Sequence, residues 1–284
     1  MLKVAILGAT GFLGRNLVQH LSHFSHVQLH GVSRSESESV APLSGSPGKF
    51  YFPIIEEIRP DVVINCVALV GHQICNDNKA LATTLNYRFP GELAELTGKI
   101  NARLVHFSTD AVFSGHEFHH PPYMETDETE PFSTYGETKL LGEQHLLENC
   151  ELVTVLRSNF FGWSKGGDRG VLDYFVKRLS LGKPVIGFNR YLVTSAYAGD
   201  IAKSLVQILD KELNGLFHLT SQDSMSKYDF GVMVANQFGF DPTLIQPRDP
   251  TAWKAEKIQH RDLSLSNVKL ASHGVAVPVQ SAGI

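Results

Sequence analysis

A glycine-rich turn near the first residue constrains the fold more than any other feature of this sequence. An apolar run at residues 3–7 leads directly into Gly8, Gly11 and Gly14, and apolar residues then recur at helical spacing as far as residue 21. In such a strand–turn–helix unit the first glycine permits the turn, the second admits a pyrophosphate, and the third lets the helix pack on the strand. The turn predicts a dinucleotide site at a helix N-terminus, with G-x-x-G-x-x-G spacing one residue looser than usual. The alternative is a purely structural turn.

Further apolar strands alternate with helices along the first half of the chain. The expected strands cover residues 26–32, 61–65, 103–107 and 152–156. Apolar strands that alternate with helices indicate a parallel sheet covered on both faces. The sequence therefore predicts an α/β fold in which residues 1–156 form a Rossmann-type, doubly wound parallel sheet.

Beyond residue 156 the pattern changes to shorter elements. We expect helices at residues 171–181 and 226–238, the second starting in a near capping box of Ser226 and Asp229, and strands at 184–186 and 216–220. Residues 157–284 are expected to form mainly a smaller C-terminal substrate-binding lobe. A segment at about residues 191–210 is expected to return to the Rossmann domain.

The end of the second expected strand bears on the choice of cofactor. It reads Ser33-Arg34-Ser35, where sites specific for NAD usually carry an acidic residue that binds the ribose 2′-hydroxyl. A hydroxyl and an arginine suit a 2′-phosphate instead. The sequence thus favours NADP(H) over NAD(H), and the alternative is that Arg34 is a solvated loop charge.

Tyr135 and Lys139 stand four residues apart in an expected helix, so both side chains project from one face. A free phenol has a pKa of roughly 10, and a nearby ammonium favours the phenolate and brings that pKa toward neutrality. The pair predicts a proton donor with a cation beside it. A half-buried tyrosine beside a lysine that reaches solvent is the alternative.

Composition excludes several other classes of protein. The formal net charge of −4 gives no general attraction to nucleic acid or to an anionic membrane. No run of 18 apolar residues and no signal peptide is evident, and three cysteines without C-x-x-C spacing fit a reducing compartment, so a cytoplasmic location is expected. His116, His119 and His120 cluster in a loop without metal-ligand spacing, and we expect no metal site.

These motifs occur in an order that resembles the extended short-chain dehydrogenase/reductases, and within them the dTDP-4-dehydrorhamnose reductase family. The resemblance rests on the glycine turn and on the following segments: Asn65-Cys-Val-Ala68, Ser108-Thr109-Asp110-Ala-Val-Phe113, Tyr123-x-Glu-x-Asp127, Pro131 and Tyr135-Gly-x-x-Lys139-Leu-x-Gly-Glu143. It covers the first ~160 residues closely and continues more loosely to residue 265.

The resemblance implies a role for each matching residue. Thr109 would hydrogen-bond the substrate oxygen, Tyr135 would exchange the proton, and Lys139 would lower the tyrosine pKa and hold the nicotinamide ribose. The cofactor would be lined by Gly8, Thr10, Gly11, Phe12, Leu13, Gly14, Ser33, Arg34, Ala68, Asn86 and Ser108, besides Tyr135 and Lys139. The substrate end would be lined by Asp110, Phe113 and Asn159.

The C-terminal part departs from the family pattern at residues 157–163 and 188–192. Trp163, Arg190 and Tyr191 lie there, and we expect them to bind substrate, because an aromatic ring can stack on a base and arginine can pair with a pyrophosphate. The alternative is that both aromatic rings pack the lobe and that Arg190 is solvated.

The resulting expectation is an NAD(P)H-dependent reductase of a nucleotide-activated 4-keto-6-deoxy sugar in surface polysaccharide synthesis, with a homodimer as the expected assembly. Two alternatives stay open. One is a nucleotide-sugar epimerase or dehydratase that keeps its NAD(P) bound and returns the hydride. The other is a non-catalytic NADP-binding regulatory subunit.

Overall fold

The computed structural model describes residues 1–33, 47–116, 121–167, 169–250 and 261–282, and it divides into two compact units. Unit 1 comprises residues 1–113, 129–157 and 206–217. Unit 2 comprises residues 114–128, 158–205 and 218–284. The chain therefore enters unit 2 first at residue 114, and it returns to unit 1 twice, at residues 129–157 and at residues 206–217.

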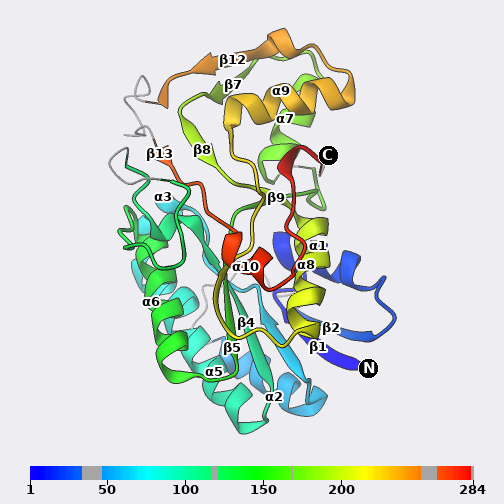
Figure 1. Ribbon diagram of the computed structural model, residues 1–284, viewed down its shortest axis with the longest axis vertical. Helices are drawn as coiled ribbons and strands as arrows, with labels where there is room; N and C mark the ends of the chain where they lie inside the picture. The colour runs from blue at the N-terminus through cyan, green and yellow to red at the C-terminus, as the bar shows by residue number, and fades with distance from the viewer. Residues whose placement is uncertain (34–46, 117–120, 168, 251–260, 283–284) are drawn as a thin grey trace. The chain divides into compact units, whose positions relative to one another are not determined.

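A six-stranded sheet with the strand order β10-β5-β4-β3-β1-β2 forms the centre of unit 1 (Figure 1). Its strands are β1 (Leu2–Leu7), β2 (Val27–Val32), β3 (Val62–Asn65), β4 (Arg103–Thr109), β5 (Val153–Ser158) and β10 (Gly215–His218). β1 pairs in parallel with β2 and β3, and β3 pairs in parallel with β4. Non-consecutive neighbours in this order require helical crossovers, which confirms the doubly wound α/β fold expected from the sequence.

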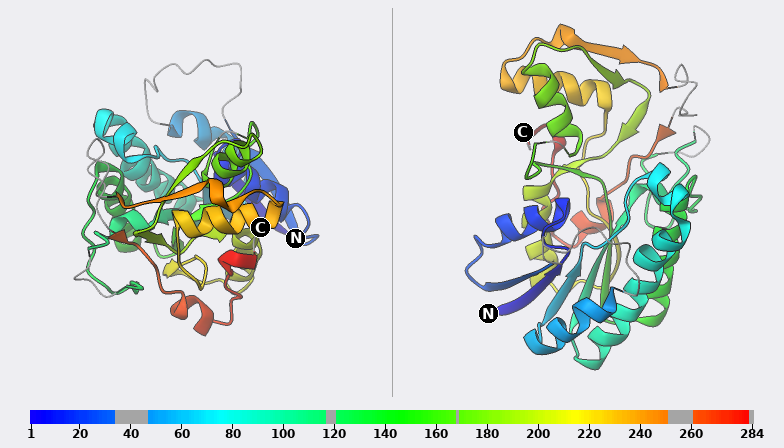
Figure 2. Two further views of the ribbon diagram at one scale, coloured as in Figure 1. Left: turned by 90° about the horizontal axis from the view of Figure 1, so that it is seen from above. Right: turned by 180° about the vertical axis from the view of Figure 1, so that it is seen from behind.

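Helices cover both faces of this sheet. They are α1 (Phe12–Leu21), α2 (Gly48–Ile58), α3 (His72–Asp77), α4 (Lys79–Thr83), the π-helix η1 (Thr84–Arg88), α5 (Phe89–Lys99), the 3₁₀ turn η2 (Asp110–Val112) and α6 (Thr134–Asn149). α2, α5 and α6 pack on one face, where Ile55, Phe89 and Leu146 meet Leu104 and Val155 of the strands. α1 lies on the other face (Figure 2). Apolar strands buried on both faces account for the near-continuous hydrophobic runs in the sequence.

Unit 2 is built from short strands and from the pair of helices α7 (Val171–Leu179) and α9 (Lys227–Phe238). Its strands pair as β11 (Met225–Ser226), β8 (Tyr191–Val193) and β13 (Arg261–Asp262), as β12 (Ile245–Arg248) with β7 (Val185–Phe188), and as β6 (Phe160–Phe161) with β9 (Ala196–Tyr197). The smaller helices are η3 (Pro242–Leu244), α10 (Val268–Ser272) and η5 (Gln280–Ala282). Helix α8 (Ala198–Asp210) is divided between the units: residues 198–205 belong to unit 2 and residues 206–210 belong to unit 1. Phe161, Phe175 and Phe230 lie at the centre of the core.

Local sequence signals place most of these elements correctly. α9 begins one residue after Ser226, whose hydroxyl accepts a hydrogen bond from the Asp229 N–H at 3.1 Å, as expected for its capping box. The helix expected at residues 171–181 ends at Leu179, and the strand expected at 216–220 is Gly215–His218. Errors of this size are normal, because helix and strand ends depend on capping and on pairing partners.

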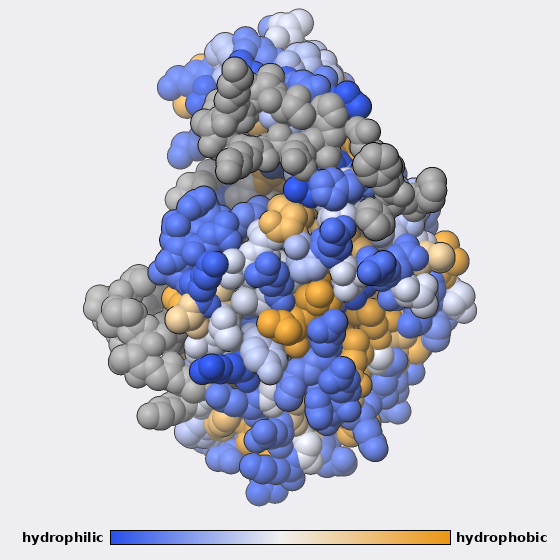
Figure 3. All heavy atoms as spheres, turned by 90° about the vertical axis from the view of Figure 1, so that its left-hand side faces the viewer, coloured by the Kyte–Doolittle hydropathy of each residue, from blue (hydrophilic) through white to orange (hydrophobic). Residues whose placement is uncertain are grey.

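The surface that carries α3 and α6 is mostly hydrophilic, with apolar side chains gathered in smaller patches (Figure 3). Ile74 and Leu141 are the most exposed large apolar residues of these two helices, at 53% and 46%. Among the helices of the described segments, none is long and apolar enough to span a lipid bilayer.

Candidate active site

The glycine turn between β1 and α1 has the geometry that its sequence predicts. Gly8 adopts a φ of +77°, a conformation that favours glycine, and its N–H donates to the Val32 carbonyl at 2.9 Å. A Cβ atom on Gly14 would lie 2.3 Å from the Gly8 carbonyl oxygen, so only glycine lets α1 approach the turn this closely. Gly11 caps α1 and has no side chain that could cover the first N–H groups of the helix. The turn therefore offers backbone donors and a positive helix end to a phosphate.

The other residues predicted to line the cofactor lie around the carboxyl ends of the unit 1 strands. Thr10 and Gly11 are exposed, Phe12, Ser33 and Ala68 are partly buried, and Leu13 and Gly14 are buried. The Ser108 hydroxyl at the end of β4 is buried and has no hydrogen-bond partner among the described residues, so it can donate to a ligand. Arg34 lies outside the described residues.

Asn86 is fully engaged with the protein. Its Oδ1 accepts from the Leu69 N–H at 2.8 Å, and its Nδ2 donates to the Leu69 carbonyl at 3.0 Å and to the Thr138 hydroxyl at 3.1 Å. The buried amide thus ties the loop after β3 to α6. We expect any effect of Asn86 on a cofactor to act through this loop, which follows Ala68.

Thr109, Asp110 and Tyr135 meet at the carboxyl end of β4. The Thr109 hydroxyl donates to Asp110 Oδ1 at 3.1 Å, accepts from the Ala111 N–H at 3.2 Å, and is hydrogen-bonded to the Tyr135 phenol. Burial raises the pKa of Tyr135 above its ordinary 10; the Thr109 hydrogen bond opposes this rise, and the Asp110 and Cys75 charges add to it. The lowering of this pKa toward neutrality by Lys139 that the sequence predicts is therefore not seen, because burial dominates, and the phenol keeps its proton, as a proton donor must.

Lys139 lies one turn along α6 from Tyr135 and is 2% exposed. Its Nζ lies 2.9 Å from His106 Nε2 and donates to the Phe107 carbonyl. Burial lowers the pKa of Lys139 from 10.5 to about 8, against the opposing effects of Glu143 and Cys66. The lysine therefore titrates near neutral pH.

Two glycines set the position of α6, although nothing in the sequence assigned them a role. A Cβ on Gly136 would lie 2.1 Å from the Ala111 carbonyl oxygen, and one on Gly142 would lie 2.2 Å from that of Asn86. Ser133 caps the helix by accepting from the Gly136 N–H at 3.3 Å, and its hydroxyl lies 2.8 Å from His72 Nδ1. The His72 ring in turn contacts the Tyr135 ring edge-on, with centroids 5.9 Å apart. These contacts hold the Tyr135 side of the helix against the end of β4.

Arg157 and Glu143 form a buried ion pair that the sequence alone did not reveal. Arg157 on β5 donates through Nε and Nη2 to the carboxylate of Glu143 on α6, with the shortest N–O distance 2.6 Å. The guanidinium also stacks over Phe113 at 5.0 Å from the ring centroid, and Phe113 is completely buried. Glu143 was visible only as the end of the Tyr135 motif. The substrate-lining role of Phe113 stays a prediction.

The remaining predicted substrate residues belong to unit 2. The Asn159 carbonyl accepts from the Ala196 N–H at 3.0 Å. Trp163 is 42% exposed and contacts Phe238 edge-on, and the ammonium of Lys227 lies 5.6 Å from the Tyr191 ring centroid. Arg190 is exposed, and its backbone carbonyl accepts a hydrogen bond from the Arg261 N–H. Their roles in substrate binding stay predictions.

Nearly the whole chain matches one known protein family. The model of the RmlD substrate binding domain family matches residues 2–282. The chain belongs to this family. This confirms the resemblance recognised in the sequence, because dTDP-4-dehydrorhamnose reductases are among the relatives that it matches.

Three relatives span most of this RmlD-family chain. The probable low-salt glycan biosynthesis reductase Agl14 of Haloferax volcanii is 30% identical and aligns over 85% of this chain and 82% of its own. The dTDP-4-dehydrorhamnose reductase of Mycolicibacterium smegmatis is 30% identical over 86% of this chain and 72% of its own. Methionine adenosyltransferase 2 subunit beta of Bos taurus is 28% identical over 97% of this chain and 84% of its own.

Solved structures agree with this family fold. The dTDP-4-dehydrorhamnose reductase of Clostridium acetobutylicum superposes with a TM-score of 0.86 at 24% identity, covering 99% of this chain and 96% of its own. That of Bacillus anthracis, solved in complex with NADP, gives the same TM-score at 19% identity and the same coverage. At these identities the likeness establishes the fold.

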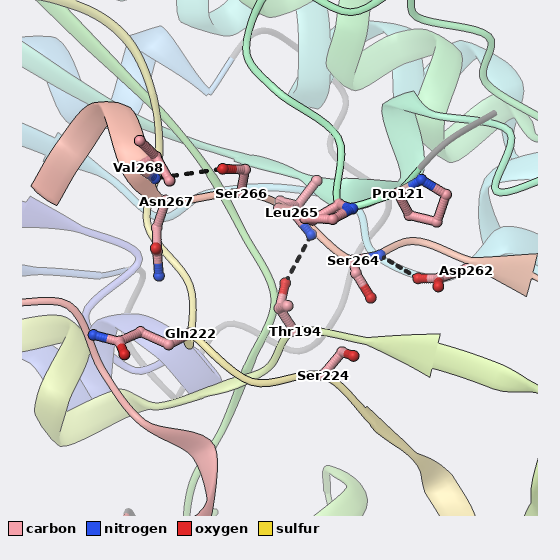
Figure 4. Close-up of a pocket in the computed structure, with 11 residues that line it drawn as sticks. Pro121, Thr194, Gln222, Ser224, Asp262, Ser264, Leu265, Ser266, Asn267 and Val268 are labelled. Atoms are coloured by element: carbon pink, nitrogen blue, oxygen red, sulfur yellow. Dashed lines mark hydrogen bonds between the residues drawn. The ribbon is translucent and has the colours of Figure 1, made fainter.

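Unit 2 of this RmlD-family chain also contains a cavity of about 360 Å³ that the sequence did not reveal (Figure 4). It is lined mainly by hydroxyl and amide side chains, among them Thr194, Gln222, Ser264 and Asn267. Neither lysine nor arginine occurs among its described lining residues, so it lacks the cations that would hold a pyrophosphate.

The histidine loop considered for metal binding is only partly described, since His119 and His120 lie outside the described residues. Within the described part of the chain, no group of three or more His, Cys, Asp or Glu side chains could hold a metal ion.

Proposed function

We propose that this protein uses NADPH to reduce a nucleotide-activated 4-keto-6-deoxy sugar in surface polysaccharide synthesis. The hydrogen-bonded pair of Thr109 and Tyr135, with Lys139 one turn away, carries this proposal. It stands at the carboxyl end of a strand in a doubly wound sheet, where such folds bind their ligands. A proton donor is needed for carbonyl reduction and has no use in a protein that only binds nucleotide.

The residues of unit 1 fit the nicotinamide cofactor. Gly8, Gly11 and the N-terminus of α1 would hold its pyrophosphate, and the Ser108 hydroxyl, which has no partner among the described residues, is a donor available to the cofactor. When bound, NADPH would supply the hydride that reduces the keto carbon. NADPH is favoured over NADH by Arg34 in the sequence, and the Bacillus anthracis neighbour solved with NADP agrees.

The protein side of the reaction is a proton transfer. The Thr109 hydroxyl would donate a hydrogen bond to the substrate oxygen, and it would turn away from Asp110 to do so. Tyr135 would then protonate the developing alkoxide with its phenolic hydrogen. The raised pKa of buried Tyr135 keeps that hydrogen in place until an oxyanion appears beside it.

We propose that unit 1 holds the cofactor and that unit 2 supplies the binding residues for the nucleotide sugar. Asn159, Trp163, Arg190 and Tyr191 are the candidates, together with Asp110 and Phe113 of unit 1. Exposed Arg190 suits a pyrophosphate and half-exposed Trp163 suits a base. Arg190→Ala should raise the KM for the sugar nucleotide and leave NADPH affinity unchanged, because it removes binding for one ligand only.

A regulatory subunit is the competing function, because the methionine adenosyltransferase subunits align over nearly the whole chain. The presence of Thr109, Tyr135 and Lys139 together argues against it, since a scaffold needs no proton donor. An epimerase or dehydratase is the second competitor, and it would return the hydride to its substrate.

The decisive assay incubates the purified protein with NADPH and a panel of nucleotide-linked 4-keto sugars, dTDP-4-dehydrorhamnose first, while the absorbance of NADPH is followed. The proposal requires NADPH oxidation in proportion to reduced sugar, and oxidation slowed by roughly 10²-fold or more in Tyr135→Phe. Sugar conversion without net oxidation would indicate the epimerase or dehydratase. No conversion, with NADPH still bound, would indicate the regulatory subunit.

A cytoplasmic location and a homodimer complete the proposal. The three free thiols, Cys66, Cys75 and Cys150, fit a reducing compartment. Sedimentation analysis of the purified protein, with and without NADPH, tests the dimer.

A further inference from the structure

A chain of three buried polar side chains crosses unit 1 beneath the proposed catalytic pair. Asn65 on β3 and His106 on β4 are direct neighbours in the sheet, with Asn65 Nδ2 3.1 Å from His106 Nδ1. The opposite ring nitrogen, Nε2, lies 2.9 Å from Lys139 Nζ on α6. Their exposed fractions are 1%, 0% and 2%, so water does not separate them.

The backbone N–H of Val67 sets the direction of each hydrogen bond among these three side chains. The Val67 N–H donates to the side chain of Asn65 at 3.0 Å, so the atom facing it must be the amide oxygen. The NH₂ group of Asn65 therefore faces His106 Nδ1 and donates to it. A neutral imidazole has one N–H, so that hydrogen of His106 must be on Nε2.

The Nε2–H of His106 thus points at Lys139 Nζ. An ammonium group only donates hydrogen bonds, whereas a neutral amine has a lone pair that accepts this N–H and still has hydrogens for the Phe107 carbonyl. The arrangement is complementary to the amine and opposes the ammonium.

The charged and titratable groups around Lys139 do not override this preference for the neutral amine. Glu143 favours the ammonium from the next turn of α6, but its carboxylate is already paired with Arg157. Burial raises the pKa of the Cys66 thiol to about 12, so it carries no charge near neutrality. Burial and Lys139 hold the pKa of His106 well below its ordinary 6.5, so the imidazole stays neutral.

We propose that Asn65 and His106 are positioning residues for Lys139, with Asn65 fixing the Nε2–H tautomer of His106 and His106 donating that hydrogen to Nζ, which favours the neutral amine. The role of Lys139 in turnover rests on the proposed function, whereas the tautomer does not. A lysine that titrates near neutrality can give and take a proton in each turnover, whereas one that stays protonated can only contribute its charge.

The direct test is the nitrogen NMR spectrum of the histidine side chains in the free, ¹⁵N-labelled protein. It is recorded about one pH unit above the Lys139 pKa of about 8, and His106 is assigned by the signal lost in His106→Gln. The inference requires a protonated Nε2 and an unprotonated Nδ1. A hydrogen on Nδ1, or on both nitrogens, overturns it. This readout needs no substrate, so it stands even if the proposed reaction fails.

An isosteric variant tests the cause. In Asn65→Asp the introduced carboxylate still accepts from the Val67 N–H but can only accept from His106, so the hydrogen should move to Nδ1 and Nε2 should accept from the Lys139 ammonium. The Lys139 titration seen in the pH profile of kcat/KM should then rise by about one unit or more. Asn149→Asp adds the same charge at the exposed end of α6 and should leave the profile unchanged. An unchanged tautomer and profile in a folded Asn65→Asp overturns the inference. If that variant does not fold, the wild-type spectrum alone decides.

Discussion

The backbone of α6 at Gly136 passes so close to Ala111 that a Cβ atom on Gly136 would lie 2.1 Å from the Ala111 carbonyl oxygen. Gly136 directly follows Tyr135, and Ala111 lies two residues beyond Thr109. The contact therefore fixes the distance between the two hydroxyls on which the proposed chemistry depends. A 1 Å displacement of such groups can cost about 10²-fold in rate.

Gly136→Ala should consequently lower both stability and turnover. Either the helix or the Ala111 segment must move, and Tyr135 then loses its alignment with Thr109. Gly98→Ala is the matched control, because Gly98 is also helical and nothing lies within 4 Å of its Cβ position. The control should raise the free energy of unfolding by about 0.5–1 kcal/mol through better helix propensity. Equal effects of the two variants on urea unfolding and on kcat would contradict the role of the contact.

Tyr135→Phe should leave folding and NADPH affinity intact while lowering kcat by roughly 10²-fold or more, the usual scale for a positioned acid. The phenyl ring keeps the edge contact with His72 and loses only the hydroxyl. Tyr87→Phe removes the hydroxyl of a partly buried tyrosine elsewhere in unit 1 and should have no effect on kcat. Steady-state kinetics and cofactor titration check both variants, and near-normal turnover in Tyr135→Phe would remove Tyr135 from the mechanism.

Lys139 should make stability depend on pH in a defined window. Its pKa is about 8 in the folded protein and 10.5 in the unfolded chain, so between these values the unfolded chain binds more protons and stability rises with pH. Below about pH 8 the cost of burying the ammonium is present in full. Lys139→Met should therefore be more stable than the wild type near pH 7, by an amount on the order of a few kcal/mol, with the gap closing as pH rises toward 10.5. Urea unfolding of both proteins at several pH values measures this, and a gap that grows with pH would show the opposite sign.

Glu143→Gln should be strongly destabilising, by about 3–5 kcal/mol, because it leaves the Arg157 guanidinium buried without a counter-charge. A double variant, Glu143→Leu with Arg157→Met, removes both charges and should recover most of the loss. Thermal unfolding of the three proteins distinguishes these cases. A double variant no more stable than Glu143→Gln would mean that the pair contributes through packing instead of charge.

Arg34→Ala should reduce the preference for NADPH over NADH. An arginine–phosphate contact is a charge-assisted hydrogen bond worth about 1.5–3 kcal/mol, so its loss should cost tenfold or more in discrimination. Binding titrations with both cofactors give the ratio for wild type and variant. Equal wild-type affinity for the two cofactors would end this assignment.

The parts of the fold that sequence reasoning predicts are those coded locally. The glycine turn after β1 follows from glycine spacing, and α1 follows from helical periodicity. Ser226 shows where α9 begins. Tyr135 and Lys139 share a helix face by spacing alone. Such signals need no knowledge of what lies across the sheet.

What the sequence could not reveal depends on pairing between distant segments. His106 reads as one more residue of a buried strand until the register places it beside Asn65, 41 residues earlier. Gly136 and Gly142 read as weak points in a helix until Ala111 and Asn86 are seen against them. Arg157 likewise becomes interpretable only when β5 brings it to Glu143.

The most direct test of the proposed activity is hydride transfer itself. The protein is incubated with NADPH deuterated at the transferred position and with dTDP-4-dehydrorhamnose, or the best substrate of the panel, and the mass of the sugar product is measured. The account predicts one deuterium in each product molecule and one NADP⁺ formed per product, with both formed more slowly, by roughly 10²-fold or more, in Tyr135→Phe. A product that forms without deuterium, or NADPH that binds and is never oxidised by any sugar of the panel, would contradict it.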